Sequence, residues 1–330
     1  MTEPESKNDK AGLNCVAIGG GNGLSTLLSG LKERVGSEIG RLSAIVAVSD
    51  DGGSSGRLRE ELQMPPPGDI RNCMVALSED SLLMSKLFRF RFGGGGDLGG
   101  HSFGNIFLAA LSEITGDFAE AVKLSSEILA SKGHLYPATD SDVRIAAKLK
   151  DGTIVRGETN IGKIGPQIDR LYLEPEDCHP LPDAMEAIKN ADLITVGPGS
   201  LYTSLLPPLL VNGVADTISA TNAVKALVCN LMTQPGETDG LSARRHLEII
   251  RDYAPRIQFD YIIVNDQKIS DEQARLYQNE GAEQIGVRGS ISEPVIEGAT
   301  IIYGKLLDEG PQVRHNSAKL SETILNCTWL

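Results

Sequence analysis

The 330-residue chain lacks the features of a secreted, disulfide-bonded or membrane-spanning protein. Its 5 cysteines are scattered, odd in number and contain no C-x-x-C pair, which argues against a disulfide framework or a zinc site of that type. The N-terminus, MTEPESKNDK, is polar and has no apolar segment typical of a signal peptide. No apolar run reaches the roughly 18 residues that a membrane span needs. We therefore expect a cytoplasmic protein with no membrane span.

Positive charge is also scarce. The chain has 31 Lys and Arg against 44 Asp and Glu, so its formal net charge is −13. A general binder of nucleic acid or of anionic membranes needs a basic face, and we expect neither as a partner. A small phosphorylated ligand is still compatible with this charge, because backbone amides and helix N-termini hold phosphate without net positive charge.

The order of apolar segments predicts an α/β protein. Apolar residues make up 41% of the chain, which suffices for a sizeable core and excludes wholesale disorder. A short strand Cys15–Ile18, a glycine turn, a helix and a second strand Leu42–Val48 open the chain as β–loop–α–β. Apolar strands follow later at Leu193–Val196, Ala226–Leu231 and Tyr261–Val264. We predict a Rossmann-like, doubly wound and mainly parallel sheet.

An antiparallel patch interrupts this α/β pattern. Residues 143–149 and 153–158 flank an Asp-Gly turn and predict a β-hairpin, which makes an inserted patch at about residues 140–175. Residues 52–68 are rich in glycine and proline and are expected to form a loop. We predict a disordered tail over residues 1–12 and a single domain over residues 13–330.

A glycine-rich turn joins the first strand to the first helix at residues 19–23. Glycines at this place let the backbone approach a phosphate, and the helix N-terminus adds a positive partial charge. The dinucleotide fingerprint G-x-G-x-x-G is not met, because its last glycine position is Leu24. The alternative is a tight turn without a ligand, but four glycines exceed what a turn needs.

Asp50 and Asp51 end the second strand. A carboxylate at this place bonds ribose hydroxyls in dinucleotide-binding folds, and it equally suits Mg²⁺ beside a diphosphate. Adjacent strand residues point to opposite faces, so we expect one of the two to face the cleft. The following residues 52–57 (GGSSGR) form a second loop rich in hydrogen-bond donors, and the alternative is a solvated strand end.

Residues 100–104 match G-x-S-x-G, the nucleophile elbow of α/β hydrolases. An elbow requires a strand that leads directly into the serine, and the preceding residues 93–100 are mostly glycine. A serine nucleophile at Ser102 is therefore the minor alternative. His101 and Asn105 at the start of a helix suit donation to a phosphate or carbonyl, while Ser102 suits a helix cap.

Later strand ends carry similar chemistry. Residues 197–204 (GPGSLYTS) follow one predicted strand and combine glycines with hydroxyl groups. Residues 230–238 (NLMTQPGET) follow the next strand and suit sugar or base hydroxyls, and Asn265 ends a further strand. Because ligands of open α/β sheets bind outside the carboxyl ends of the strands, these loops together predict a ligand cleft there.

The motifs in sum resemble the gluconeogenesis factors of the YvcK type, within the CofD-like superfamily. The strings that carry the resemblance are residues 17–25 (AIGGGNGLS), 48–59 (VSDDGGSSGRLR), 66–72 (PPGDIRN), 101–105 (HSFGN), 197–204 and 230–238. They occur in order over roughly residues 14–325. Tyr277 and Arg314 fit a tyrosine and an arginine that this branch tends to carry.

The resemblance implies a Rossmann-like core and a cytoplasmic protein needed for gluconeogenic growth and cell shape. It implies UDP-N-acetylglucosamine as ligand, with NAD as another candidate. The sister branch implies an alternative, a 2-phospho-L-lactate transferase that moves a phospholactyl group from a guanosine diphosphate-linked donor to a deazaflavin with Mg²⁺. A homo-oligomer and a regulatory protein partner stay open, and so does enzymatic activity.

These readings assign roles to the candidate residues. The glycine loops hold the diphosphate, Asp50 or Asp51 takes ribose or Mg²⁺, Tyr277 stacks on uracil and Arg314 counters phosphate charge. The full set of expected ligand contacts is Gly20, Gly21, Asn22, Gly23, Asp50, Ser54, Ser55, Arg57, Asn72, His101, Asn105, Gly197, Gly199, Ser200, Leu201, Tyr202, Asn230, Thr233, Asn265, Tyr277 and Arg314. Asp50 and Asp51 are also the expected catalytic and metal residues if the chain is a transferase.

Overall fold

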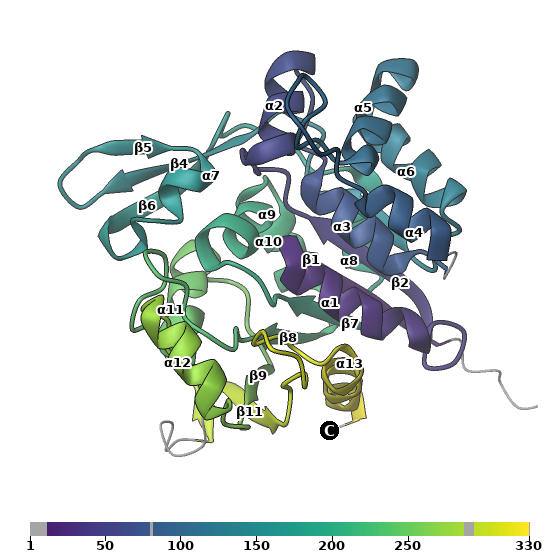
Figure 1. Cartoon of the computed structure of the whole chain (residues 1–330). Coiled ribbons are helices and arrows are strands. Elements are labelled where there is room, and N and C mark those ends of the chain that lie inside the picture. Colours follow the sequence, from purple (N-terminus) through teal and green to yellow (C-terminus); the bar gives the residue numbers. More distant parts are fainter. Residues whose placement is uncertain (1–11, 80–81, 287–293, 330) are drawn as a thin grey trace, which may run out of the picture.

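The computed structural model describes residues 12–79, 82–286 and 294–329, so the predicted tail over residues 1–12 lies almost wholly outside them (Figure 1). At its centre is an eight-stranded sheet in the order β10-β11-β9-β8-β7-β1-β2-β3. The strands are β1 Leu13–Gly19, β2 Ile39–Val46, β3 His134–Pro137, β7 Leu193–Val196, β8 Val224–Val228, β9 Tyr261–Asn265, β10 Val295–Ile296 and β11 Ala299–Gly304. Among the described residues, every pairing in this sheet is parallel except β10 with β11. The α/β prediction is confirmed.

The order of the strands creates a switch point between β1 and β7. From β1 the chain moves outward through β2 to β3, and from β7 it moves the other way through β8 and β9. The connections that follow β1 and β7 therefore leave the sheet in opposite directions. A crevice opens at such a point in open α/β sheets, outside the carboxyl ends of the strands.

Helices cover both faces of the sheet (Figure 1). Helix α1 packs against α3 and α13, and α8, α9 and α10 form another contacting group that reaches β1. The helices are α1 Gly21–Leu31, α2 Gly53–Leu62, α3 Gly68–Leu77, α4 Leu82–Arg89, α5 Phe103–Thr115, α6 Phe118–Ile128, α7 Glu158–Ile161, α8 Pro182–Lys189, α9 Leu206–Leu210, α10 Val214–Ala220, α11 Ala243–Tyr253, α12 Asp271–Asn279 and α13 Ser317–Asn326. Within the described ranges, none of these is long and apolar enough to cross a bilayer.

The predicted insertion is a three-stranded antiparallel sheet beside the main one (Figure 1). It comprises β4 Arg144–Leu149, β5 Ile154–Arg156 and β6 Ile168–Glu174, in the order β5-β4-β6. Asp151-Gly152 lies between β4 and β5, as the turn pattern predicts, and Gly152 has a φ of +90°. The insertion shares one continuous apolar core with the main sheet.

The expected loop over residues 52–68 is wrong in its first part. Helix α2 occupies Gly53–Leu62, although two of its first four residues are glycine. Ser54, Ser55, Leu58 and Arg59 are buried, so tertiary packing outweighs the poor local helix propensity of this segment. Strand β3, at the end of the sheet, also went unpredicted, because four residues ending in proline form too short a pattern.

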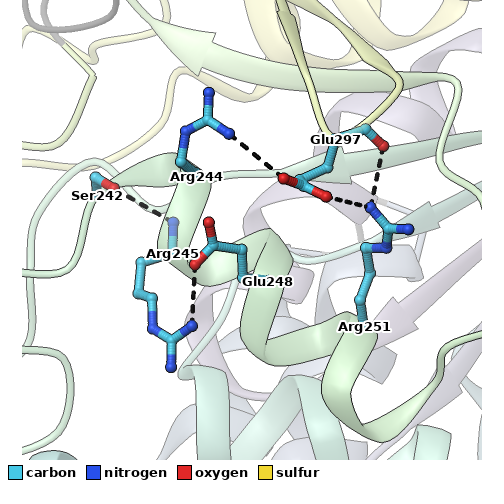
Figure 2. Close-up of polar contacts among 6 residues, drawn as sticks. All are labelled: Ser242, Arg244, Arg245, Glu248, Arg251 and Glu297. Atoms are coloured by element: carbon cyan, nitrogen blue, oxygen red, sulfur yellow. Dashed lines mark hydrogen bonds and ion pairs between the residues drawn. The ribbon is translucent and has the colours of Figure 1, made fainter.

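Figure 2 shows how α11 is tied to the turn between β10 and β11. Arg251 Nη1 donates to Glu297 Oε2 at 2.7 Å and to the Glu297 carbonyl oxygen at 3.2 Å, while Arg244 Nη1 lies 3.5 Å from Glu297 Oε1. Ser242 caps the helix by accepting from the Arg245 N–H. Exposed ion pairs contribute about 0–1 kcal/mol each, so this cluster sets the position of α11 more than it stabilises the fold.

Candidate functional site

A cavity of about 500 Å³ lies at the switch point. Its walls are the loop after β1, the loop after β7, the segment after β8, part of α12 and the segment before α13. These segments are far apart in sequence, and the loops after β1, β7 and β8 meet because parallel strands bring their carboxyl ends to the same edge of the sheet.

The loop after β1 is shaped by close backbone approach. A Cβ on Gly20 would lie 2.6 Å from Asp69 Oδ2, and one on Gly23 would overlap the carbonyl oxygen of Pro198. The N–H of Gly21, at the start of α1, donates to Asp69 Oδ2 at 2.7 Å. Glycine is thus required for contact with neighbouring protein groups, and a carboxyl group already occupies one amide of this helix N-terminus.

The loop after β7 is held by side chains from the segment after β8. Asn230 accepts from the Gly199 N–H at 3.0 Å and donates to the Gly199 carbonyl at 2.8 Å. Gln234 Nε2 donates to Ser200 Oγ at 2.7 Å. Asn230 thereby fixes the backbone that lines the cavity, in addition to lining it itself.

Leu201 and Tyr202 lie outside the lining of this cavity. They begin a π-helical turn, Leu201–Leu205, and are 0% and 6% exposed. The buried Glu237 accepts from the Tyr202 N–H at 2.9 Å, and burial raises the pKa of Glu237 to about 7. The amide of Tyr202 is therefore bound to a carboxyl group of the protein.

Three carboxyl groups meet beside the glycine loops. Asp69 and Glu158 line the cavity, and Glu158 comes from α7 of the inserted sheet. Burial and the nearby Asp50 raise the pKa of Asp69 to about 7. Burial, the charge of Asp50 and a hydrogen bond with it hold the pKa of Glu158 well above its usual range. The raised pKa values of Asp69 and Glu158 reduce the negative charge at the cavity wall near neutral pH.

Asp50 and Asp51 point to different partners, although they lie beyond the end of β2 at Val46 and not on the strand as predicted. Asp50 accepts from the Gly52 N–H and faces Glu158, whereas Asp51 accepts from Thr159 N–H at 3.0 Å and from its hydroxyl at 2.7 Å. Among the described residues, no three His, Cys, Asp or Glu side chains are arranged to hold a metal ion. The pair does not fit a shared Mg²⁺, and we derive no step through one.

A separate buried polar network joins α2 to α5. Ser54 Oγ lies 3.0 Å from His101 Nδ1 and accepts from Asn105 Nδ2 at 3.1 Å, and Ser55 Oγ is 3.5 Å from the same amide. Arg57 donates to the Gly99 carbonyl at 2.7 Å. These predicted contacts, and Asn72, lie outside the cavity lining and hold protein groups together.

Ser102 is the N-cap of α5. Its Oγ accepts from the Asn105 N–H at 3.2 Å and from Arg71. The preceding residues 93–100 contain no strand. The cap interpretation is confirmed, and the geometry of a nucleophile elbow is absent here.

The cavity brings together about half of the predicted contacts. The predicted residues that line it are Gly20, Gly21, Asn22, Gly23, Gly199, Ser200, Asn230, Thr233, Tyr277 and Arg314. The predicted residues outside its lining are Asp50, Ser54, Ser55, Arg57, Asn72, His101, Asn105, Gly197, Leu201, Tyr202 and Asn265. Asn265 instead accepts from the Leu306 N–H and donates to the Gln267 carbonyl, which shapes the loop after β9.

Several residues that line the cavity are not predicted by the sequence. Asp69 and Glu158 lie far from the glycine loops in sequence, and neither is among the predicted contacts, although Asp69 falls within one of the strings that carry the family resemblance, residues 66–72. Tyr277 lines the cavity and its hydroxyl accepts from the Val313 N–H at 3.0 Å, which links α12 to the segment that carries Arg314. His315 also lines it, and burial lowers the pKa of His315 to about 4, so its imidazole is neutral.

The fold and the cavity together define the class, a Rossmann-like α/β protein with a ligand cavity at the switch point of its sheet. The chain belongs to the CofD family, whose model, described as 2-phospho-L-lactate transferase CofD, matches residues 15–307.

Similar known proteins indicate which branch of the CofD family the chain resembles. It is 46% identical over 312 residues to the gluconeogenesis factor of Halalkalibacterium halodurans, covering 94% of this chain and 95% of that one. It is 43% identical over 310 residues to the gluconeogenesis factor of Bacillus subtilis, covering 94% and 96%. A crystal structure of a protein from Bacillus halodurans matches with a TM-score of 0.89 and 45% identity, covering 95% and 99%. The resemblance to gluconeogenesis factors is confirmed.

Proposed function

We propose that the chain is a cytoplasmic regulatory protein that binds a nucleotide sugar, UDP-N-acetylglucosamine, and is needed for gluconeogenic growth and cell shape. The observation that carries the proposal is the cavity itself. Its lining combines both glycine loops with Tyr277 and Arg314. Backbone amides and a guanidinium suit a diphosphate, and an aromatic ring suits a base. The relatives named gluconeogenesis factor support the physiological part.

The carboxyl groups in the cavity are compatible with an anionic ligand. Asp69 and Glu158 both have raised pKa values, so near neutral pH they carry less charge than their number implies. A protonated carboxyl group donates a hydrogen bond to a phosphate oxygen where a carboxylate would repel it. This supports a phosphate-bearing ligand in an otherwise strongly acidic protein.

The second candidate is a transferase of the 2-phospho-L-lactate type. The family model that matches residues 15–307 favours it, since it is described by that activity. The same loops would hold a guanosine diphosphate. The divergence of Asp50 and Asp51 argues against the metal arrangement that we expected for this reaction.

A thermal-shift panel with UDP-N-acetylglucosamine, NAD, GDP and a deazaflavin separates the candidates. A ligand that binds only the folded chain raises its stability by RT ln(1 + [L]/Kd). A shift with the uridine nucleotide sugar alone supports the proposal. No shift with it, together with a shift from GDP and the deazaflavin, would replace it with the transferase.

Variants locate the binding to this cavity. Arg314→Gln should weaken binding of the nucleotide sugar at least about tenfold, because a charge-assisted hydrogen bond contributes about 1.5–3 kcal/mol. Arg256→Gln is the matched control, since Arg256 pairs with Asp216 on the surface and is absent from the lining. Equal affinities of the two variants in calorimetry would show that the ligand binds elsewhere.

A further inference from the structure

Strand β3 ends the eight-stranded sheet, and a second cavity lies along it. β3 pairs with β2 on one side, and no strand among the described residues pairs with its other side. A cavity of about 710 Å³ is lined by residues of β3, by one face of α6 and by the start of α8. Helices α6 and α8 both contact β3. The cavity is separate from the one at the switch point, with which it shares no lining residue.

The backbone hydrogen bonds show which groups of β3 face this cavity. Ala138, just beyond β3, donates its N–H to the Val46 carbonyl of β2. Backbone groups alternate in direction along a strand, so those of Tyr136 also point to β2 and those of Leu135 and Pro137 point away. Pro137 has no N–H, and proline is tolerated in an edge strand at a position where the N–H would point away from the sheet. The outer edge therefore offers the Leu135 N–H and the carbonyls of Leu135 and Pro137.

Two aromatic side chains lie next to this outer edge of β3. His134 and Tyr136 present parallel rings with centroids 6.2 Å apart and an interplanar angle of 5°. Arg41 Nη2 donates to the Tyr136 hydroxyl at 3.2 Å and supports that ring. A flat aromatic surface next to unpaired strand groups suits the alternate side chains of an added strand.

The charged residues that line this cavity indicate what kind of segment would bind there. The lining has four acidic residues, Asp117, Glu120, Glu127 and Asp183, against the two cations Arg41 and Lys123. Lys123 already lies 3.7 Å from Glu120. A second copy of this chain would bring the same acidic surface to its partner, in a protein of net charge −13. Charge therefore favours a basic segment over self-association.

We propose that the groove along β3 is a docking site for an extended, basic segment of a partner protein, which adds to the sheet as a further strand. Main-chain hydrogen bonds to Leu135 and Pro137 supply affinity, and Glu127 and Asp183 select basic side chains from the two walls. The proposal is independent of the ligand at the switch point, because the two cavities share no residue.

Short synthetic peptides test the proposal on the full chain. The probe is fluorescein-labelled Lys-Val-Lys-Val-Lys-amide, followed by fluorescence anisotropy. The comparison peptides are Glu-Val-Glu-Val-Glu-amide and the lysine peptide with an N-methyl group on every backbone nitrogen after the first residue, so that neither edge of the peptide can donate to β3. We expect saturable binding of the lysine peptide, and at least about fivefold weaker binding of the N-methylated one, because two hydrogen bonds of about 0.5–1.5 kcal/mol each are lost. Equal affinity of these two would overturn strand addition, since both carry the same charge.

A second test reverses the charge of one residue that lines the groove along β3. Glu127→Lys should weaken the lysine peptide about fivefold, whereas Glu309→Lys should leave it unchanged, because Glu309 follows β11 at the far end of the sheet. If both variants lost the same affinity for the lysine peptide, binding would depend only on the net charge of the protein, and the proposed site would be overturned. Sedimentation that shows a dimer broken by Glu127→Lys would assign the edge to a second copy instead.

Discussion

At the scale of single residues, the role of a side chain depends more on its contacts with neighbouring protein groups than on the local sequence pattern. Gly20 and Gly23 suit a phosphate loop in sequence, and in the structure they also leave room for Asp69 and Pro198. Asp50 and Asp51 are adjacent in sequence and bind different partners. The same residue types thus serve the ligand cavity and the packing around it.

Replacement of Gly20 by alanine should destabilise the chain. The added Cβ would lie 2.6 Å from Asp69 Oδ2 and 3.3 Å from Ala47 Cβ, so the loop or Asp69 must shift. We expect a loss of about 1–3 kcal/mol in urea unfolding, as for other overpacked sites. Gly95→Ala is the control, because nothing lies within 4 Å of its Cβ and we expect no measurable change. A Gly20→Ala variant as stable as the parent would contradict the close approach.

Protonation of Asp69 should make stability depend on pH. Its pKa is raised to about 7 in the folded chain, above the ordinary value of 3.8, so folding favours its protonated form. This contribution is fully present below about pH 4 and declines as pH rises from about 4 to about 7, because the unfolded chain loses the proton first. Asp69→Asn should flatten the urea-unfolding profile between about pH 4 and 7, the interval between the pKa values of the unfolded and the folded chain. An unchanged slope in this variant would exclude Asp69 as its source.

At the scale of elements, the inserted sheet reaches into the main site through α7. Asp51, in the segment between β2 and α2, accepts two hydrogen bonds from Thr159 at the start of α7. Glu158 on the same short helix lines the cavity. The insertion is thus attached to the carboxyl edge of the main sheet where the ligand is proposed to bind.

Loss of this attachment should loosen α7. Asp51→Ala removes the acceptor of both Thr159 hydrogen bonds, and we expect faster amide hydrogen exchange over residues 158–161. Unfolding free energy should fall by about 1–2 kcal/mol, because the donors are partly exposed. Asp151→Ala, in the turn of the same insertion, should leave exchange in α7 unchanged. Identical exchange in both variants would place the attachment elsewhere.

At the scale of the whole molecule, one apolar core joins both sheets. Ile145, Ala147 and Leu171 of the insertion belong to the same buried cluster as the strands of the main sheet. A unit that shares its core is expected to unfold as one.

Calorimetry should therefore record a single cooperative unfolding transition for the full chain. Removal of core contacts in the insertion by Leu171→Ala should lower its midpoint without splitting it, at a cost of about 2–5 kcal/mol. Arg170→Ala, the exposed neighbour, controls for the strand position. Two resolved transitions would show that the insertion is a separate domain and would contradict the predicted single domain over residues 13–330.

The sequence by itself determined the α/β class, the antiparallel insertion and the glycine and amide loops at the strand ends, because each depends on local patterns of apolar, glycine and polar residues. Helix α2 needed tertiary packing, since its glycine-rich start has poor helix propensity. The tertiary structure alone decided that Asp69 and Glu158 meet the glycine loops, and that Ser54, His101 and Asn105 do not line the cavity. Such contacts join residues far apart in sequence, and strand order, which no local pattern encodes, brings them together.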